Sequence, residues 1–572
     1  MKSIKTALKV FLLSFKVDFI NSLIVLLISI ILGLLPYLNT KGMLIIANLS
    51  NNSNLGLIIL GIIFIVISAV GIKLISSLKN IFINKLSNQL EFRLKKDLKE
   101  KIVKIDYRTR EQNKFQQELR LAYNALNPFG IVKMNSFIPL LISNMITIIS
   151  LSIILIQCDI FIWIFIIVLT CITIILRNVV IKKNIADERS IIDDRMLEET
   201  MLGNVTNAES YAELRLNNAV DWATEKWEEQ QKRLFKKELK INNKFQAKSE
   251  SINFIAHNLI TITALLILIL MNKADVASVV MIFTAIQNLV NNLYIFSSEM
   301  SITKNFLENF KHYNTILDKK DCSLSHKTEI KINEKVFMHF KDVSFKYNDK
   351  YALEKINFDI FAGEKIAIVG YNGSGKTTLL KLLLGIYSPY EGNIVYYGCN
   401  EDERPMVSVV WQDFARYKFS LRENITLYNP KLDFDDDKIN EILKKYKLND
   451  LLVYGSNVIL ANEFGGINLS TGQWQKLSLI RSRLKDAYDI YIMDEATSAL
   501  DSYTESEIIN EILNGSKTLV YVCHRLICVK SFDKIIFMDS GKIAGIGSHD
   551  ELFETNQEYK ELYLSQAKEY LN

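Results

Sequence analysis

The sequence predicts a multidomain membrane protein, with a six-helix, all-α transmembrane bundle followed by an α/β domain. Three observations predict it. The chain has 572 residues, whereas single cores rarely grow beyond about 250–300 residues. Its first half contains six long apolar segments, and its second half alternates short apolar runs with helical stretches. We therefore expect at least two units of different solvent environment.

The composition supports a membrane-bound part and argues against a nucleic-acid partner. Hydrophobic residues make up 49% of the chain, which is high for a soluble protein of this size. The net charge of +5 is small for the length, so we expect no nucleic-acid binding. The six cysteines form no C-x-x-C pair, which predicts reduced thiols. They are Cys158, Cys171, Cys322, Cys399, Cys523 and Cys528.

Six apolar segments are long enough to cross a hydrocarbon core of about 30 Å. The first follows a lysine-bearing stretch, 1–16, that we expect to lie along the inner membrane face. A cleaved signal peptide is the alternative for this stretch, but its short apolar run and small-residue cleavage site are not evident. The predicted spans are 17–35, 57–74, 137–156, 160–181, 252–271 and 276–296.

The segments between the spans predict the topology. Short segments carry only Lys41 and Lys273 as basic residues, whereas 80–136 and 182–251 are long and rich in Lys and Arg. The positive-inside rule places the long segments and both termini in the cytoplasm. Within these long segments, residues 86–105 and 195–242 show helical spacing without proline, which predicts that the spans continue as long cytoplasmic helical extensions.

One predicted span carries a polar stripe. Two readings remain open: the amides line a substrate route, or they hydrogen-bond neighbouring helices. The stripe consists of Gln287, Asn288, Asn291 and Asn292.

Composition also sets the expected domain boundaries. We expect a transmembrane domain over 1–317, a polar linker over 318–334 and an α/β domain over 335–572. Strands of the α/β domain are expected at 336–345, 366–369, 406–410, 490–493, 518–522 and 534–538.

The stretch GYNGSGKT follows an apolar run at 364–369 and precedes a helical stretch at 378–384. The pattern G-x-x-x-x-G-K-[ST] between a strand and a helix is the P-loop, whose backbone N–H groups and helix N-terminus bind phosphates. A simple glycine-rich turn is the alternative, which the flanking elements disfavour. The expected ATP-binding residues here are Gly370, Tyr371, Asn372, Gly373, Ser374, Gly375, Lys376, Thr377 and Thr378. The second half is thus predicted to be a P-loop nucleotide-binding domain.

Two acids end an apolar strand further along the chain. We expect Asp494 to help hold Mg²⁺ through water, with Thr377 supplying a hydroxyl to the same ion. Glu495 is then placed to polarise the attacking water as general base.

Together these features resemble an ATP-binding cassette half-transporter of the exporter type, over nearly the whole chain. The resemblance implies that Tyr347 stacks on adenine and that Gln412 contacts Mg²⁺ and senses the membrane domain. It also implies that His524 contacts the γ-phosphate and that Asp501, in Ser-Ala-Leu-Asp, communicates across a dimer.

The family signature is represented by Leu-Ser-Thr-Gly-Gln at 469–473. The resemblance implies that Ser470, Thr471, Gly472 and Gln473 bind the ATP held by a partner subunit. The commonest family form has Gly in place of Thr471, so turnover is the property this departure puts in doubt.

One P-loop and one signature per chain imply a second half-transporter subunit, in the simplest arrangement a homodimer that sandwiches two ATP molecules. The turns near 112–117 and 204–211 are then expected to pass motion to the spans, in a bacterial plasma membrane with the nucleotide-binding domain in the cytoplasm.

The stretches 412–417, 421–425 and 472–476 are similar to exporters of lantibiotics and related modified peptides. We expect export of such a peptide. A lipid or multidrug exporter that moves an amphiphilic small molecule is the alternative, and a non-transporting ATP-gated regulator is the third. The first span begins almost at once, so we expect no fused leader protease.

Overall fold

The computed structural model describes the chain in two compact units. One comprises residues up to Ile105 together with Thr109–Asp321, and the other comprises Asp106–Arg108 and the chain from Cys322 onward. The described residues are 2–48, 55–158, 160–270, 276–321, 336–397, 406–429, 431–432, 434–485, 488–494, 502–515, 517–523 and 526–571.

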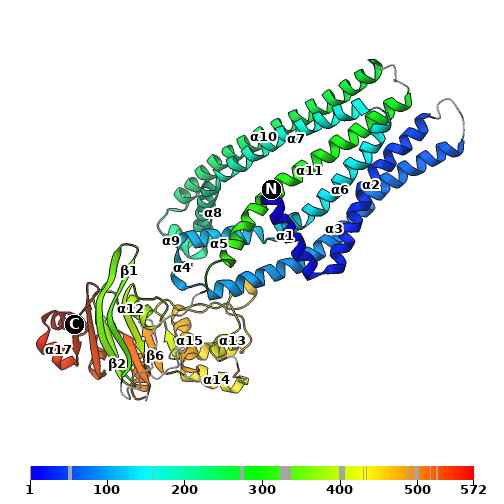
Figure 1. The fold of residues 1–572 in the computed structure, drawn as a ribbon. Coiled ribbons are helices and arrows are strands. Elements are labelled where there is room, and N and C mark those ends of the chain that lie inside the picture. The colour runs from blue at the N-terminus through cyan, green and yellow to red at the C-terminus, as the bar shows by residue number, and fades with distance from the viewer. Residues whose placement is uncertain are drawn as a thin grey trace. The chain divides into compact units, whose positions relative to one another are not determined.

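The first unit is entirely helical in the part of the chain that the structure describes (Figure 1). Two of its helices, α3 and α10, have 50 and 51 residues and extend well beyond their apolar portions, as expected for spans with long extensions. The helices are α1 (Lys2–Val17), α2 (Phe19–Asn48), α3 (Leu55–Lys104), α4 (Tyr107–Glu111), α5 (Asn113–Ala125), α6 (Pro128–Cys158), α7 (Ile160–Arg189), α8 (Ile192–Thr206), α9 (Ala208–Leu216), α10 (Val220–Leu270) and α11 (Val276–Leu317).

Within the described residues, five helical stretches are long and apolar enough to cross a membrane. They are Phe19–Ala47, Leu55–Lys104, Pro128–Ile156, Ile160–Thr206 and Val220–Ile267. The sixth predicted span, 276–296, lies in α11, where the apolar stretch found is the shorter Val279–Asn292. The helical membrane region is confirmed, and the count of six stays a prediction.

Helix α2 is longer than the span predicted at 17–35. It begins at Phe19, after Asp18, and runs to Asn48 with Pro36 in its interior. Thr40 Oγ1 donates a hydrogen bond of 3.0 Å to the carbonyl oxygen of Pro36. Proline removes one backbone donor but does not end a helix whose neighbours restore the packing.

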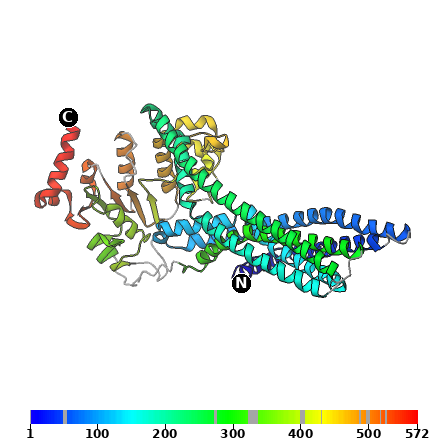
Figure 2. The same ribbon diagram turned by 90° about the horizontal axis from the view of Figure 1, so that it is seen from above.

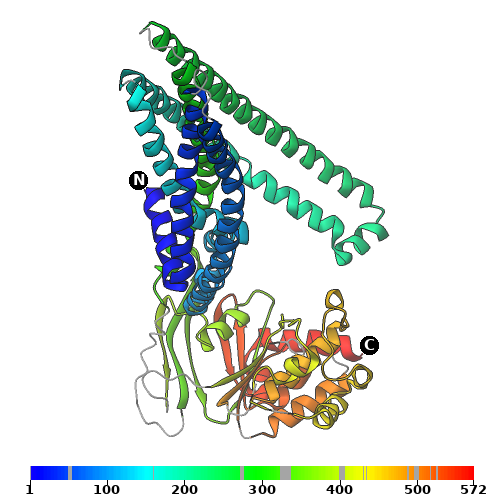
Figure 3. The same ribbon diagram turned by 90° about the vertical axis from the view of Figure 1, so that its right-hand side faces the viewer.

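Small residues allow close helix packing around α2. A Cβ atom on Gly42 would lie 2.7 Å from the carbonyl oxygen of Gly61 in α3, and one on Gly33 would lie 2.7 Å from that of Ser143 in α6. Backbones that approach so closely require glycine, as in other membrane bundles. Figures 2 and 3 show α2, α3 and α6 running alongside one another.

The polar stripe on α11 divides between two environments. Asn288 Nδ2 donates to Thr40 Oγ1 of α2 at 3.3 Å, and Asn292 Nδ2 donates to the backbone of Asn288 at 2.7 Å. Gln287 and Asn291 are exposed in the single chain. The helix-bonding interpretation therefore fits Asn288, and the route-lining interpretation stays a prediction for the exposed pair.

Within its described residues, the second unit contains two sheets. A three-stranded antiparallel sheet has the order β2-β1-β4, and a six-stranded sheet has the order β5-β6-β7-β3-β8-β9, with only the edge strand β9 antiparallel. The strands are β1 (Val336–Tyr347), β2 (Lys350–Phe361), β3 (Lys365–Gly370), β4 (Glu391–Tyr396), β5 (Val407–Val410), β6 (Ile490–Asp494), β7 (Thr518–Val522), β8 (Lys534–Asp539) and β9 (Lys542–Gly547).

Both faces of the six-stranded sheet are covered, as parallel strands require. One core joins it to the smaller sheet and to α12 (Lys376–Leu383), and another packs α16 (Ser502–Leu513) and the C-terminal helices on its other face. A third hydrophobic core packs the helices at 421–426, 436–445 and 471–483 against one another. The remaining helices are α13 (Leu421–Thr426), α14 (Asp436–Lys445), α15 (Thr471–Arg483), α17 (His549–Thr555) and α18 (Gln557–Leu571).

Candidate functional site

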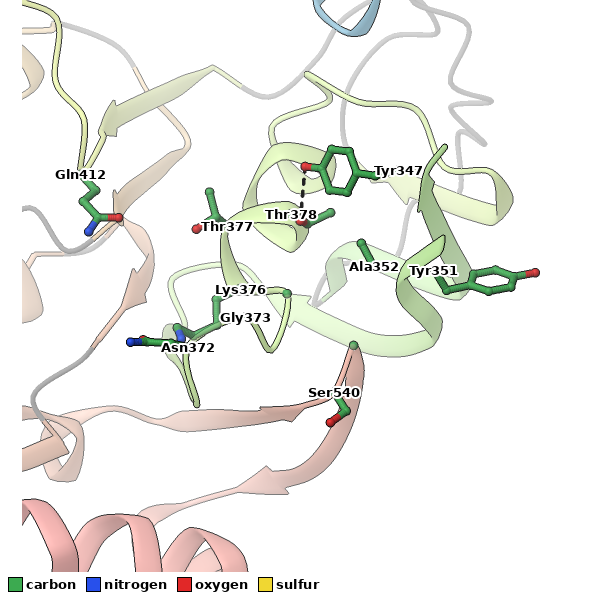
Figure 4. Close-up of a pocket in the computed structure, with 12 residues that line it drawn as sticks. Tyr347, Tyr351, Ala352, Asn372, Gly373, Lys376, Thr377, Thr378, Gln412 and Ser540 are labelled. Carbon is green, nitrogen blue, oxygen red and sulfur yellow. Dashed lines mark hydrogen bonds between the residues drawn. The ribbon is translucent and has the colours of Figure 1, made fainter. Parts of the chain in front are cut away.

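A polar cleft of about 710 Å³ opens at the end of β3 in the second unit. Strand β3 lies between β7 and β8, and α12 begins directly after the loop that follows it. Figure 4 shows side chains from β1, β2, the loop, α12 and the β8–β9 turn around this cleft. Its lining residues are Tyr347, Tyr351, Ala352, Asn372, Gly373, Gly375, Lys376, Thr377, Thr378, Gln412, Ser540 and Gly541.

The loop after β3 has a backbone that only glycine adopts readily. Gly370, Gly373 and Gly375 have φ values of 151°, 80° and 103°. A Cβ atom on Gly370 would lie 2.1 Å from the carbonyl oxygen of Met538, whereas one on Gly373 would meet no atom within 4 Å. The loop is therefore packed against β8 on one side and open on the other. An open concave loop at a helix N-terminus is suited to an anion.

Two buried polar groups in this loop suit phosphate oxygens. Lys376 is 6% exposed, and its Nζ donates to the carbonyl oxygens of Gly370 and Tyr371 at 2.9 and 3.0 Å. Ser374 is 3% exposed, and its Oγ has no hydrogen-bond partner among the described residues. A buried hydroxyl without a partner is costly, and a bound anion would satisfy it.

The oxygen donors that would hold Mg²⁺ come from separate elements. Thr377 is in the first turn of α12, and Gln412 follows β5; Figure 4 shows both facing the same side of the cleft. Asp494 ends β6 and is 1% exposed. Hydroxyl, amide and carboxylate oxygens are the ligands that Mg²⁺ prefers, so these residues fit the ion.

Three of the predicted site residues lie outside the described residues. They are Glu495, Asp501 and His524. Their neighbours are placed: Asp494 pairs with Val522 across β6 and β7, and Val522 pairs with Ile368 of β3. Parallel strands bring their carboxyl ends to one edge, so Asp494 and Val522 end their strands at the same edge of the sheet as the end of β3.

Tyr347 is held in place by neighbours. Its Oη lies 3.4 Å from Thr378 Oγ1 and 3.4 Å from Tyr387 Oη, and its ring packs edge-on against Phe345 with centroids 5.1 Å apart. The side chain remains 42% exposed and lines the cleft, so its free face is open to a flat ligand.

Sequence reasoning missed four lining residues. Tyr351 and Ala352 come from β2, and Ser540 and Gly541 form the β8–β9 turn. The Asp-Ser-Gly-Lys stretch signals that turn, whose residues Ser540 and Gly541 have φ values of 44° and 79°. Nothing in the sequence indicates that it meets β2. Figure 4 shows the Tyr351 ring directed away from the loop.

The signature segment begins a helix elsewhere in the second unit. Ser470 caps α15: its Oγ accepts from the Gln473 backbone N–H at 3.2 Å, and its own N–H donates to Gln473 Oε1 at 2.8 Å. Thr471 is exposed in the first turn. None of the described residues that line the P-loop cleft comes from this segment. Its exposed helix N-terminus is therefore available to a ligand brought by another surface.

Part of the second unit is similar to a known protein family. Residues 353–498 match the family model described as ABC transporter. The chain has the fold of a bacterial Atm1-family ABC exporter whose structure was solved with ATP bound, with a TM-score of 0.76 over 97% of this chain and 98% of that chain, at 18% identity.

Two proteins named for the transport of nisin and of subtilin are among the similar sequences. The nisin transport ATP-binding protein NisT of Lactococcus lactis subsp. lactis is 31% identical over 393 residues, 64% of this chain and 64% of that protein. The subtilin transport ATP-binding protein SpaT of Bacillus subtilis is 32% identical over 389 residues, 64% of this chain and 62% of that protein. The match thus spans less than two thirds of either relative. An ATP-dependent lipid A-core flippase of Francisella tularensis is 35% identical over 236 residues, 39% of this chain and 38% of that protein.

Proposed function

We propose that this chain is an ATP-binding cassette transporter and forms one half of an ATP-driven peptide exporter. The observation that carries the proposal is the glycine cradle after β3, where the buried Ser374 hydroxyl has no partner among the described residues, in a chain that also has membrane-length helices. Two halves would form the working unit in a bacterial plasma membrane.

Different residues of the cleft would bind different parts of ATP. The adenine stacks on the free face of Tyr347, the loop N–H groups and Ser374 bind phosphate oxygens, and Lys376 turns from the loop carbonyls to the outer phosphates. Thr377, Gln412 and Asp494 would hold Mg²⁺, which when bound neutralises charge on the phosphates.

Hydrolysis would need the residues that follow β6 and β7. Glu495 accepts a proton from the attacking water as general base, and His524 donates a hydrogen bond to the γ-phosphate. Asp501 would communicate with the partner subunit. Each of these roles is carried over from the family motif.

A second copy would complete the site. Because Ser470 and its neighbours do not line the P-loop cleft of their own chain, they would meet the γ-phosphate held by the partner. ATP then favours the closed dimer by the difference between its affinities for the closed and open states. Loss of the γ-phosphate removes that preference and reopens the pair.

The proposed cargo is a peptide of the lantibiotic type. Support comes from the relatives named for nisin and subtilin transport, whose matches each cover 64% of this chain. The relative named as a lipid A-core flippase matches over 39% of this chain, so a lipid or other amphiphile is the second candidate.

Inside-out proteoliposomes that contain the purified full-length chain test both the ATP hydrolysis and the identity of the transported substrate. We expect ATP-dependent uptake of a labelled lantibiotic precursor, and we expect Glu495→Gln to bind ATP but to abolish turnover and uptake. Glu507→Gln, an exposed acid on α16, is the matched control and should retain both activities.

Three other outcomes contradict parts of the proposal. Normal hydrolysis by Glu495→Gln would remove the general-base role. Translocation of a labelled lipid without uptake of peptide would favour the second candidate. ATP turnover with no transported solute would indicate a regulator that uses ATP only as a switch.

A further inference from the structure

A second cleft, of about 500 Å³, lies within the first unit and shares no lining residue with the P-loop cleft. Its lining comes from residues 177–188 of α7, 242–250 of α10 and 298–306 of α11, and from Phe129 at the start of α6. Figure 1 shows α7 and α10 as neighbouring helices of this unit. The cleft is therefore enclosed by elements far apart in the sequence.

A buried amide in this cleft lacks a partner. Asn184 is 9% exposed, and its Nδ2 donates to Glu188 Oε1 at 3.0 Å one turn along α7. Asn184 Oδ1 has no hydrogen-bond partner among the described residues. A buried acceptor that lacks a hydrogen bond is energetically unfavourable. A ligand that donates a hydrogen bond would satisfy it.

The charges of the lining also favour a donor with positive charge. Arg177 is 7% exposed and donates from Nη2 to Ser249 Oγ at 3.2 Å. Two carboxylates, those of Glu188 and Glu250, line the same cleft, and among the described lining residues Arg177 is the one basic side chain. The lining thus carries one more negative than positive charge. An ammonium group supplies three donors and the opposite charge.

Apolar rings form another wall of the cleft. Phe129 and Phe306 pack edge-on with centroids 5.8 Å apart, and Phe245 comes from α10. Aromatic walls beside acceptors suit a ligand that is basic at one point and apolar next to it. A simple metal cation or an acidic peptide matches only part of this lining.

We propose that this cleft binds a segment of the transported peptide in which a basic side chain adjoins a hydrophobic one. The inference rests on the proposed peptide-export function and names the chemistry of its cargo. The ammonium group meets Asn184 Oδ1 and the carboxylates of Glu188 and Glu250, and the neighbouring apolar side chain packs on Phe245 and Phe306.

Nucleotide-free binding to the full-length chain in lipid nanodiscs tests the site directly. The probes are acetyl-Phe-Lys-Phe-amide and its Gln and Glu analogues at the central position. Hydrogen bonds to a charged group are worth about 1.5–3 kcal/mol, so we expect the Lys peptide to bind at least about tenfold more tightly than the Gln peptide. The Glu peptide should bind most weakly.

Two variants and a control locate the effect. Glu250→Gln and Asn184→Leu should each bring the Lys and Gln peptides to within about threefold of each other. Glu225→Gln, an exposed acid on the same helix α10, should keep the wild-type preference. Basal ATP turnover, measured in parallel, reports whether each variant is folded.

Equal binding of the three peptides to the wild-type chain would overturn the inference. So would a preference that survives both Glu250→Gln and Asn184→Leu. Because binding is measured without nucleotide, absent ATP turnover with intact peptide preference would contradict the proposed export function alone. Intact ATP-driven peptide uptake with no preference for the Lys peptide would contradict the cleft alone.

Discussion

The guanidinium of Arg481 donates a hydrogen bond to the carbonyl oxygen of Ala415 at 3.0 Å, which joins α15 to the segment that follows Gln412. Arg481 is 1% exposed, and its charge lies over the rings of Tyr417 and Trp474, 5.1 and 5.9 Å from their centroids. Burial lowers the pKa of this arginine below its usual range. The helix that begins at the signature and the segment that follows Gln412 are thus tied together by one buried cation.

Arg481→Met should loosen this connection. The change keeps an unbranched side chain but leaves the Ala415 carbonyl without its donor, at a cost of about 1–3 kcal/mol. We expect a lower melting temperature of the full-length protein and reduced ATP turnover. Arg483→Met on the same helix removes a surface pair with Glu511 at 2.7 Å, which should cost less than about 1 kcal/mol. Equal effects of the two substitutions would show that burial of Arg481 is not what matters.

Tyr347 and Tyr351 line the same cleft but should differ in their effect on ATP. Stacking of a base on an aromatic ring is worth about 1–3 kcal/mol. Tyr347→Ala should therefore raise the KM for ATP about tenfold, whereas Tyr347→Phe keeps the ring and should stay within about twofold of the wild type. Tyr351→Ala is the matched control, because that ring points away from the loop (Figure 4). A larger effect from Tyr351→Ala would reassign the adenine contact.

Thr471 offers a test of the unusual signature. Its β-branched side chain is in the first turn of α15, next to the capping Ser470. If it crowds the nucleotide, Thr471→Gly should raise kcat about twofold, at a stability cost of a few tenths of a kcal/mol, about the difference in helix propensity. Thr471→Ser keeps the hydroxyl and removes only the methyl group. Identical turnover in all three proteins would show that this side chain leaves the nucleotide unobstructed.

His549 predicts a pH dependence of the second unit. Its Nδ1 lies 2.9 Å from Tyr559 Oη. Burial lowers the pKa of His549, Lys530 in the 3-10 turn Leu526–Ser531 lowers it further, and Asp550 acts in the opposite direction. The folded protein therefore binds the proton less readily than the unfolded chain, whose histidine titrates near pH 6.5.

Stability from this group is present above pH 6.5 and is lost as the pH falls below it. Melting temperatures measured from pH 7.5 to 5.5 should fall less steeply for His549→Gln than for the wild type. The same slope in both proteins would mean that His549 keeps its proton affinity on folding.

Some parts of the fold are visible in the sequence because their signals are local. The strand, glycine loop and helix around Lys376 are consecutive, and the parallel strands read as continuous apolar runs because both faces are buried. Strands β2, β4 and β9 were not predicted. Strand β2 mixes charged and apolar residues and is irregular in its pairing with β1, so its pattern is weak.

The rest of the cleft depends on tertiary structure. Tyr351 and Ser540 belong to strands and turns far apart in the chain, and only the fold brings them to one cleft. Hydropathy likewise locates the apolar portions of α3 and α10 that could cross a membrane. It does not locate the ends of these helices, because their remaining turns are helical but rich in charged residues. Glu495, Asp501 and His524 lie outside the described residues, so their roles stay predictions.

Helix α10 has no proline or glycine in its 51 residues. At a rise of about 1.5 Å per residue it is a rod of about 75 Å, more than twice the depth of a hydrocarbon core. Kinks need such residues or an interruption of the backbone bonds, so this rod can act as a lever. A tilt of about 10° about one end would sweep the other through about 13 Å of travel. Substituting a proline near the middle of α10 should kink the helix, so that a tilt of one end no longer moves the other, while both halves still fold.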